Sequence, residues 1–228
     1  VTLTGRNNNL PDGVNICLNG KHIKGEYSEG TKLNVNGTLG ITDCGTAGSI
    51  GELSLIGDRA KVTVYGGSIA ENSTLIIDGG AGFNMTGNAK NDGVLRICGD
   101  ADFTMDGNAK NNNTINLKEM SSECRIVFGG HAEGGYVTVE QPQYGAGFRM
   151  IGNAGITELT GFYCEICLTM KDNAEIGDVG IGFLSLSLSG KAKLGSAESA
   201  YTIEERDFVL QDDAQLIGSV TYDTSDGD

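Results

Sequence analysis

One short motif recurs along this chain about every 21 residues, and it limits the possible folds more than any other feature. Its clearest copies read GFNMTGNAK, DFTMDGNAK, GFRMIGNAG and CLTMKDNAE, and they end at Lys90, Lys110, Gly155 and Glu175. They share an apolar residue, a Met two positions later, and Gly or Asp before Asn-Ala. Five weaker copies bring the total to nine, and they end at Gly45, Ser68, Ala132, Ala192 and Ala214. A period this short is typical of a solenoid.

The apolar residues inside each copy alternate, as Phe83 and Met85 do, and a period of two belongs to a β-strand. A second alternating segment precedes most copies, and Leu75 and Ile77 are an example. A shorter third segment follows several copies, as at Ala174–Ile176. Three short strands per repeat predict one coil of a single-stranded right-handed parallel β-helix. Leucine-rich repeats need a leucine consensus and helical repeats need about 33 residues, so neither fits.

Stacked coils predict two columns of inward apolar side chains that run along the solenoid. The first column contains Phe83, Phe103, Ile126, Phe148, Leu168, Leu186 and Phe208. The second contains Met85, Met105, Phe128, Met150, Met170, Leu188 and Leu210. Because the methionines fall at inward strand positions, we interpret them as core residues rather than as copper or haem ligands.

An Asn precedes the Ala of each strong copy, at positions 88, 108, 153 and 173. We expect this Asn to lie at a corner of the coil with a positive φ, together with the preceding Gly, and its amide to bond to the next coil. His131, Lys191 and Asp213 replace it in weaker copies. Such replacements disfavour a metal-binding or sugar-binding ladder at this corner.

The sequence resembles the right-handed β-helix surface proteins of the pectin-lyase-like superfamily, and more narrowly the adhesin-like repeat regions of Gram-positive gut bacteria. The inward Phe, the Met and the Gly-Asn corner carry this resemblance, as does LPDGVNICLNGKHIKG followed by LNVNGTLGITDCGTAGSI near the N-terminus. The similar region covers residues 10–218, nearly the whole chain. It implies the fold, but that superfamily includes lyases, glycosidases, adhesins and plain stalks.

We expect three parts: an N-terminal cap in residues 1–30, the β-helix coils in residues 31–218, and a tail or linker in residues 219–228. The 36 glycines and 2 prolines agree with turn-rich β structure and with very little helix. The first residues contain no targeting segment. The resemblance implies a monomeric domain of a longer, exported chain that is displayed on a bacterial cell surface or attached to the cell wall.

The net charge of -14 argues against nucleic acid and anionic membrane surfaces as partners. No window approaches the ~20 apolar residues of a membrane span, so we expect no membrane insertion. His22 and His131 fall in different coils, without Cys or His at ligand spacing, which makes a zinc site improbable. We predict no catalytic, metal or cofactor-binding residues, and no cofactor.

The alternative is a polysaccharide lyase or glycoside hydrolase of the pectin-lyase-like fold, which would need clustered carboxylates on one face. The only acidic cluster contains Asp78, Asp100, Asp102 and Asp106. It could hold a calcium ion or form a solvated acidic surface, and both interpretations remain open. The column beside the inward Phe column places Asp102 next to Arg125, without a second acid. We therefore favour a non-catalytic adhesin-like or spacer domain that binds a glycan or host protein.

Aromatic side chains that could stack on a sugar are few, and Trp is absent. The candidates are Tyr136, Tyr144, Phe162, Tyr163 and Tyr201. They could equally cover the surface of the solenoid without binding anything.

The six cysteines are expected to be mostly free, with at least four free thiols, because a solenoid core does not depend on disulfides. Cys124 takes the position held by Ala81, Ala101 and Ala146 in other coils, as a small buried residue would. The pairs most able to form a disulfide are Cys164 with Cys167 and Cys17 with Cys44.

Overall fold

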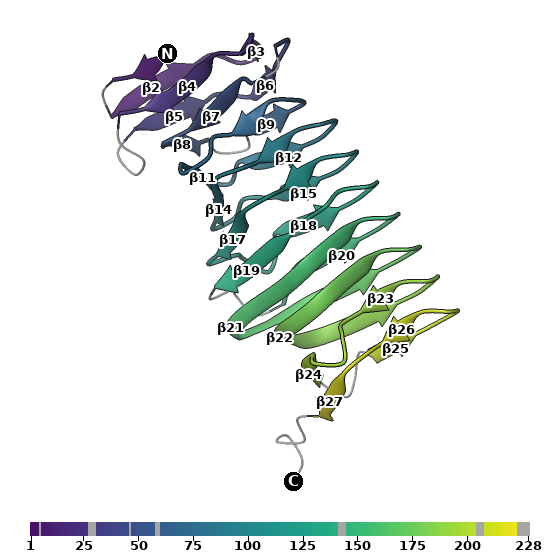
Figure 1. Ribbon diagram of the computed structural model, residues 1–228. Coiled ribbons are helices and arrows are strands. Elements are labelled where there is room, and N and C mark those ends of the chain that lie inside the picture. Colours follow the sequence, from purple (N-terminus) through teal and green to yellow (C-terminus); the bar gives the residue numbers. More distant parts are fainter. Residues whose placement is uncertain are drawn as a thin grey trace.

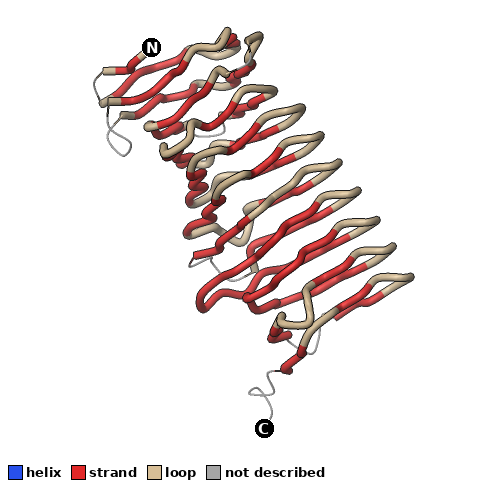
Figure 2. Tube along the Cα trace, in the orientation of Figure 1, coloured by secondary structure: helices blue, strands red, loops and turns tan. Residues whose placement is uncertain are grey.

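The computed structural model describes residues 1–4, 6–26, 31–45, 47–57, 60–140, 145–203 and 208–222, except for the side chains of residues 162–165 and 222. Within these ranges the chain is all β, without a helix. Its parallel strands stack as a solenoid of about nine turns (Figure 1, Figure 2). The described residues thus contain no helix that is long and apolar enough to cross a membrane.

The strands form three faces, which we number in chain order, and most turns contribute one strand to each face. The first face contains β2 (Asn7–Leu10), β5 (Lys32–Val35), β8 (Leu53–Ile56), β11 (Thr74–Asp78), β14 (Val94–Cys98), β17 (Thr114–Lys118), β19 (Tyr136–Glu140), β24 (Ala200–Ile203) and β27 (Ser219–Tyr222). The second face contains β3 (Val14–Cys17), β6 (Thr38–Thr42), β9 (Lys61–Val64), β12 (Gly82–Met85), β15 (Phe103–Met105), β18 (Arg125–Phe128), β20 (Ala146–Met150) and β25 (Phe208–Leu210).

The third face has the shortest strands. It contains β1 (Thr2–Leu3), β4 (His22–Gly25), β7 (Ser49–Gly51), β10 (Ser68–Ile69), β13 (Lys90–Asn91), β16 (Lys110–Asn111), β23 (Lys193–Leu194) and β26 (Gln215–Leu216). Two long strands, β21 (Gly155–Met170) and β22 (Glu175–Leu188), continue around the corners and contribute to more than one face. Strands β2, β3 and β4 pair in parallel with β5, β6 and β7, so residues 7–25 already follow the coil pattern.

The predicted columns are confirmed at every pairing. The first column runs from Phe83 to Phe208 and the second from Met85 to Leu210, in the predicted order. Both columns continue toward the N-terminus, the first as Val62, Leu39 and Val14. Nine pairings separate Val14 from Phe208, about 22 residues each. The sequence periodicity thus predicted the fold, and it predicted the register of these two columns from Phe83 to Leu210.

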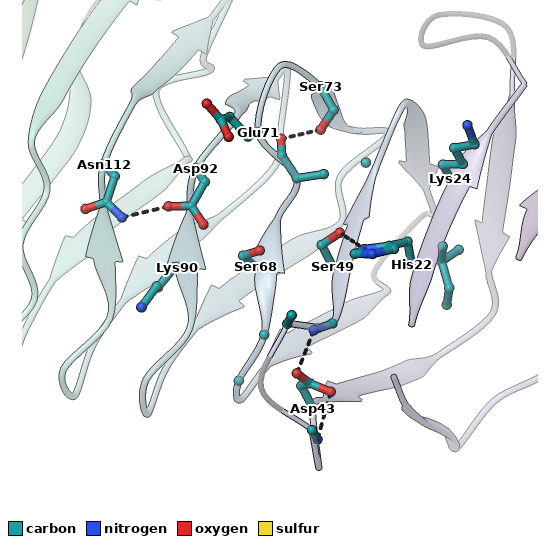
Figure 3. Close-up of a pocket in the computed structure, with 18 of the residues that line it drawn as sticks. His22, Lys24, Asp43, Ser49, Ser68, Glu71, Ser73, Lys90, Asp92 and Asn112 are labelled. Carbon is teal, nitrogen blue, oxygen red and sulfur yellow. Dashed lines mark hydrogen bonds between the residues drawn. The ribbon is translucent and has the colours of Figure 1, made fainter. Parts of the chain in front are cut away.

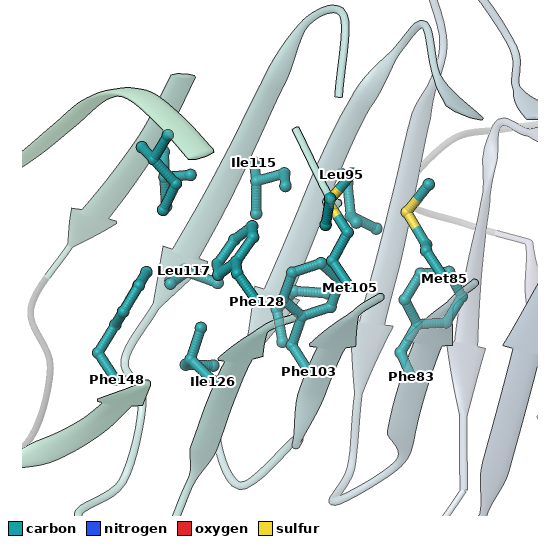
Figure 4. Packing of buried hydrophobic residues seen from close by; sticks show 14 of the residues in the cluster. Phe83, Met85, Leu95, Phe103, Met105, Ile115, Leu117, Ile126, Phe128 and Phe148 are labelled. Atoms are coloured by element: carbon teal, nitrogen blue, oxygen red, sulfur yellow. The ribbon is translucent and has the colours of Figure 1, made fainter. Parts of the chain in front are cut away.

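One coil exchanges the positions of its large and small core residues. The aromatic residue of this coil is Phe128, in the second column, and its partner in the first column is Ile126. Phe128 nevertheless contacts Phe103 and Phe148, with ring centroids 5.7 and 5.4 Å apart (Figure 4). Because the exchange nearly conserves side-chain volume, the ring stack can cross from one column to the other.

The corner between the second and third faces corrects the prediction for the Asn residues. The positive φ falls on the preceding residue, such as Gly87 (65°), Gly107 (68°) or Asp172 (63°), and not on the Asn. Glycine has no Cβ to clash in this conformation, and Asp tolerates it better than most residues. The predicted bond between coils does form where Asn173 donates its amide to Asn153 Oδ1 at 2.8 Å.

The N-terminal copies of the motif need a second correction. Ser49 pairs with Ser68, and Ser68 pairs with Lys90, so Gly48 and Gly67 match Ala89 in place of the predicted Gly45 and Ser68. The corner after β6 is longer than in later coils. A disulfide joins Cys17 to Cys44 there, with 6.2 Å between the Cα atoms. One of the two suspected cysteine pairs is therefore bonded.

Candidate binding site

A groove of about 1190 Å³ runs over the N-terminal part of the third face, across β4, β7, β10 and β13 (Figure 3). We call it the axial trough because it crosses successive coils and therefore follows the long axis of the solenoid. Two ladders of outward side chains form its floor and ends. One ladder contains His22, Ser49, Ser68 and Lys90, and the other contains Lys24, Gly51, Ala70 and Asp92.

The trough exists because side-chain size changes along these ladders. The outward residues are long in β4, short in β7 and β10, and longer again in β13, so the middle coils leave a depression. Packing requires the small size at Gly51, since a Cβ there would lie 2.1 Å from Ser73 Oγ. Ser73 is buried and donates its hydroxyl to the carbonyl of Ala70 at 2.6 Å. The floor is therefore part of the packing of the coil.

One wall of the trough is the long corner after β6, which Asp43 holds together. Its carboxylate accepts backbone N–H groups from Gly20 at 2.8 Å, Gly45 at 3.1 Å and Gly48 at 2.7 Å. The bond from Gly20 has the largest effect and, with that from Gly48, lowers the pKa of Asp43 below its ordinary value. Because the nearby Cys17–Cys44 disulfide joins the same two coils, this wall has two independent cross-links.

Tyr65 also lies at this wall, and its side chain is 56% exposed. It follows β9 directly, at the corner that leads into Gly66 and Gly67. A Cβ at Gly40 in β6 would lie 3.7 Å from Tyr65 Cε2, so the ring lies over the second face of the neighbouring coil. Tyr65 thus lines the edge of the trough while its ring packs toward the second face.

The opposite wall contains Glu52, Glu71 and Asn72, at the corner between the third face and the next coil. Glu52 and Asn72 both have a φ of 55°. This conformation is common for Asn but costs free energy for Glu, and such strained residues are concentrated at functional sites. Glu52 and Glu71 thus contribute two acidic residues to the lining of this wall.

Several polar groups in the trough already have partners. His22 Nδ1 lies 2.7 Å from Ser49 Oγ, and Asn112 donates its amide to Asp92 Oδ1 at 2.7 Å (Figure 3). Two lysines, Lys24 and Lys90, lie at the two ends of the trough. The lining also contains four acidic residues, Asp43, Glu52, Glu71 and Asp92, so the formal charge of the trough is negative.

The structure separates the four aspartates of the possible calcium site. Asp78 and Asp106 each accept the N–H of the following glycine at 2.7 Å, and Asp102 accepts the N–H of Arg125 at 2.8 Å. Asp102 and Asp106 lie at opposite ends of β15. Among the described residues, no group of three or more His, Cys, Asp or Glu side chains could hold a metal ion.

The aromatic residues that the sequence offered for sugar stacking differ in position and exposure. Tyr136 is 53% exposed on the first face, outside the trough. Tyr201 is only 1% exposed and donates its hydroxyl to the carbonyl of Leu194, so it belongs to the core and not to a sugar platform. Burial raises the pKa of this hydroxyl. Tyr144 and the side chains of Phe162 and Tyr163 lie outside the described residues.

Tyr65 was missed at the sequence level. Its signal was present, since an aromatic residue directly before Gly66 and Gly67 at a coil corner is solvent-accessible in most registers. It became informative only after the pairing of Ser49, Ser68 and Lys90 showed which outward residues are neighbours.

Cys98, Cys124 and Cys167 are free, and Cys164 lies outside the residues whose side chains are described. Cys124 is buried beside Ser121, in the same position as Ala101 and Ala146, as predicted. Burial raises the pKa of the Cys98 and Cys124 thiols, which lowers their reactivity.

Comparison with known proteins returned no matching family model, curated protein or solved structure.

Proposed function

We propose that this chain is a non-catalytic, adhesin-like β-solenoid of the pectin-lyase-like type that is displayed outside the cell and binds a glycan or host protein. The axial trough is the observation that carries the proposal. It combines hydroxyl, amide and carboxylate groups with a floor of short side chains in one depression that spans several coils, and the exposed Tyr65 lies at its edge. Such a combination is suited to holding an extended polar ligand.

Two further features support this setting. A disulfide such as Cys17–Cys44 persists in oxidising environments, which favours an exported protein. A stack of paired strands is rigid, so the solenoid can hold a binding face at a distance from its point of attachment. The same rigidity would serve a plain spacer, so a binding measurement has to separate the two roles.

The proposal is tested by measuring retention of the purified protein on immobilised plant polysaccharides, mucin and host matrix proteins. We expect saturable binding to at least one surface, without release of reducing ends or unsaturated products during long incubation. Retention on none of these surfaces would contradict a binding role and leave only the spacer. Steady product formation would replace it with the polysaccharide lyase or glycoside hydrolase alternative.

A further inference from the structure

We propose that Asn36 is a site of spontaneous deamidation and isoaspartate formation, and that the Asp43 carboxylate protects the equivalent dipeptide at Asn19. The chain contains two Asn-Gly dipeptides, Asn19-Gly20 and Asn36-Gly37. Both asparagines are exposed, and both dipeptides lie at corners between strands of the N-terminal coils. This inference does not depend on the binding role proposed above.

The modification needs only water and the groups of the dipeptide itself. The backbone nitrogen of the glycine loses its proton and bonds to Cγ of the asparagine, while the Cγ–Nδ2 bond breaks and Nδ2 leaves as ammonia. Water then opens the cyclic imide at one of its two carbonyls and yields aspartate or isoaspartate. Glycine favours ring closure because it has no Cβ to hinder the close approach of the two groups. The rate therefore depends on whether the glycine N–H is free to react.

At the Asn19 corner, a hydrogen bond holds the reacting nitrogen. The Gly20 N–H donates to Asp43 Oδ1 at 2.8 Å. The same carboxylate accepts the N–H groups of Gly45 and Gly48, so the corner fixes its position. Attack by the Gly20 nitrogen would therefore first have to break a charge-assisted hydrogen bond, which is stronger than a bond between neutral groups.

At the Asn36 corner, the backbone is anchored on both sides of the reacting nitrogen but not at it. The Asn36 N–H donates to the carbonyl of Leu10 at 3.2 Å, and the carbonyl of Gly37 accepts the N–H of Lys61 at 2.8 Å. Within the described part of the chain, the Gly37 N–H has no acceptor. Isoaspartate would lengthen the backbone here by one carbon and disturb the contact with the preceding coil.

The two corners form a matched pair because each has a carboxylate beside its dipeptide. Asp12 lies against Gly37, since a Cβ on that glycine would be 2.1 Å from Asp12 Oδ1. This oxygen, however, accepts the N–H and the hydroxyl of Thr38, at 2.7 and 3.0 Å. The corners therefore differ in which N–H the carboxylate holds, and the glycine nitrogen stays unbonded only beside Asn36.

The experiment incubates the native protein in mildly alkaline buffer and follows both sites by mass spectrometry. After reduction and a brief tryptic digestion, Asn19 falls in the peptide of residues 7–21 and Asn36 in that of residues 33–59. Fragment ions distinguish Asn36 from Asn34, and chromatography separates isoaspartate from aspartate. We expect Asn36 to convert at least about tenfold faster than Asn19, the effect of one hydrogen bond to a charged group. In urea the two sites should convert at similar rates.

The Asp43→Asn variant tests the protection of Asn19, with Asn36 in the same molecule as the control. The replacement keeps the size of the side chain but removes its charge, so the Gly20 N–H is held less strongly. We expect the conversion of Asn19 to rise toward that of Asn36, and the conversion of Asn36 to stay unchanged. A β-sheet circular dichroism spectrum like that of the parent confirms that the variant is folded.

Equal conversion of the two sites in the native protein, or faster conversion of Asn19, would overturn this inference. So would a native Asn36 that stays intact while the chain in urea is converted. Unchanged conversion of Asn19 in the Asp43→Asn variant would overturn the protective role of Asp43. Each of these results would leave the proposed binding function intact.

Discussion

Individual residues matter most where every coil places the same kind of side chain in one column. Met105 is fully buried and lies between Met85 and Phe128 in the second column. Leu210 continues the same column but is 46% exposed, because no described strand pairs with the outer edge of β25. The same position in the coil therefore has different energetic weight in the middle of the solenoid and at its end.

Replacing Met105 with Asp would place an unpaired charge in the dry interior of the column. We expect Met105→Asp to lower the free energy of unfolding by roughly 3–5 kcal/mol, the cost of an uncompensated buried charge. Met105→Leu keeps the volume and should cost less than about 1.5 kcal/mol. Urea denaturation followed by circular dichroism measures both values, and nearly equal values for the two variants would show that the column is not packed as described.

The corner residue Asp172 combines a positive φ with a hydrogen bond to the preceding coil. Its Oδ2 accepts the N–H of Gly152 at 3.1 Å. Asp172→Gly loses this bond but relaxes the backbone, whereas Asp172→Ala loses the bond and places a Cβ in a left-handed conformation that costs about 1–2 kcal/mol. We therefore expect Ala to destabilise more than Gly in chemical denaturation. The reverse order would contradict the corner geometry.

At the level of the strand, the third face contains a buried polar ladder. Asn91 and Asn111 occupy the inward column that holds Ile69 in one direction and Ile156 in the other. Asn91 donates its amide to Asn111 Oδ1 at 2.6 Å, and Asn111 donates to the carbonyl of Gly134 at 2.6 Å. The turn that contains Gly134 has only an isolated bridge at Glu133 in place of a third-face strand. Asn111 therefore satisfies a carbonyl that this interruption leaves inside the core.

The hydrogen bonds of Asn111 predict that its replacement by Ile destabilises the fold, whereas hydrophobicity alone would predict that it stabilises the fold. Asn111→Ile matches the column elsewhere, but it removes the donor for Gly134 and the acceptor for Asn91. We expect a loss of about 2–3 kcal/mol, since buried polar groups would remain unpaired. The double variant Asn91→Ile/Asn111→Ile should recover part of this loss. A single variant as stable as the parent in thermal melts would show that the amide is dispensable.

The corner after β6 should weaken in acid, because the depressed pKa of Asp43 means that folding favours its carboxylate. A lowered folded-state pKa adds stability above the ordinary pKa of Asp, and that stability is lost as pH falls through the lower, folded value. We expect exchange protection of the Gly20 and Gly48 amides to fall selectively on acidification. In the Asp43→Asn variant, the exchange protection of these two amides should be low already at neutral pH and nearly independent of pH. Hydrogen–deuterium exchange measures both, and pH-independent protection in the parent would contradict the role of Asp43.

At the scale of the whole molecule, the Cys17–Cys44 disulfide joins N-terminal coils, and it is the one disulfide among the described side chains. Titration of the denatured, unreduced protein should find four thiols, because Cys17 and Cys44 are bonded and the other cysteines lie in coils that the apolar columns hold. The double variant Cys17→Ser/Cys44→Ser should give the same count. Six thiols in the parent would exclude the disulfide, and two would require a second one that involves Cys164.

The amino-acid sequence by itself determined the solenoid, the faces and the inward columns. A period-two pattern that repeats about every 21 residues can bury its apolar side chains only by stacking equivalent positions, as Phe83 on Phe103 shows. The trough, the buried state of Tyr201 and the Cys17–Cys44 bond were decided only by the tertiary structure. Each depends on corner lengths, which alternation does not constrain, and on which outward residues become neighbours across coils. The ladder of His22, Ser49, Ser68 and Lys90 has steps of 27, 19 and 22 residues, so no constant spacing could align it.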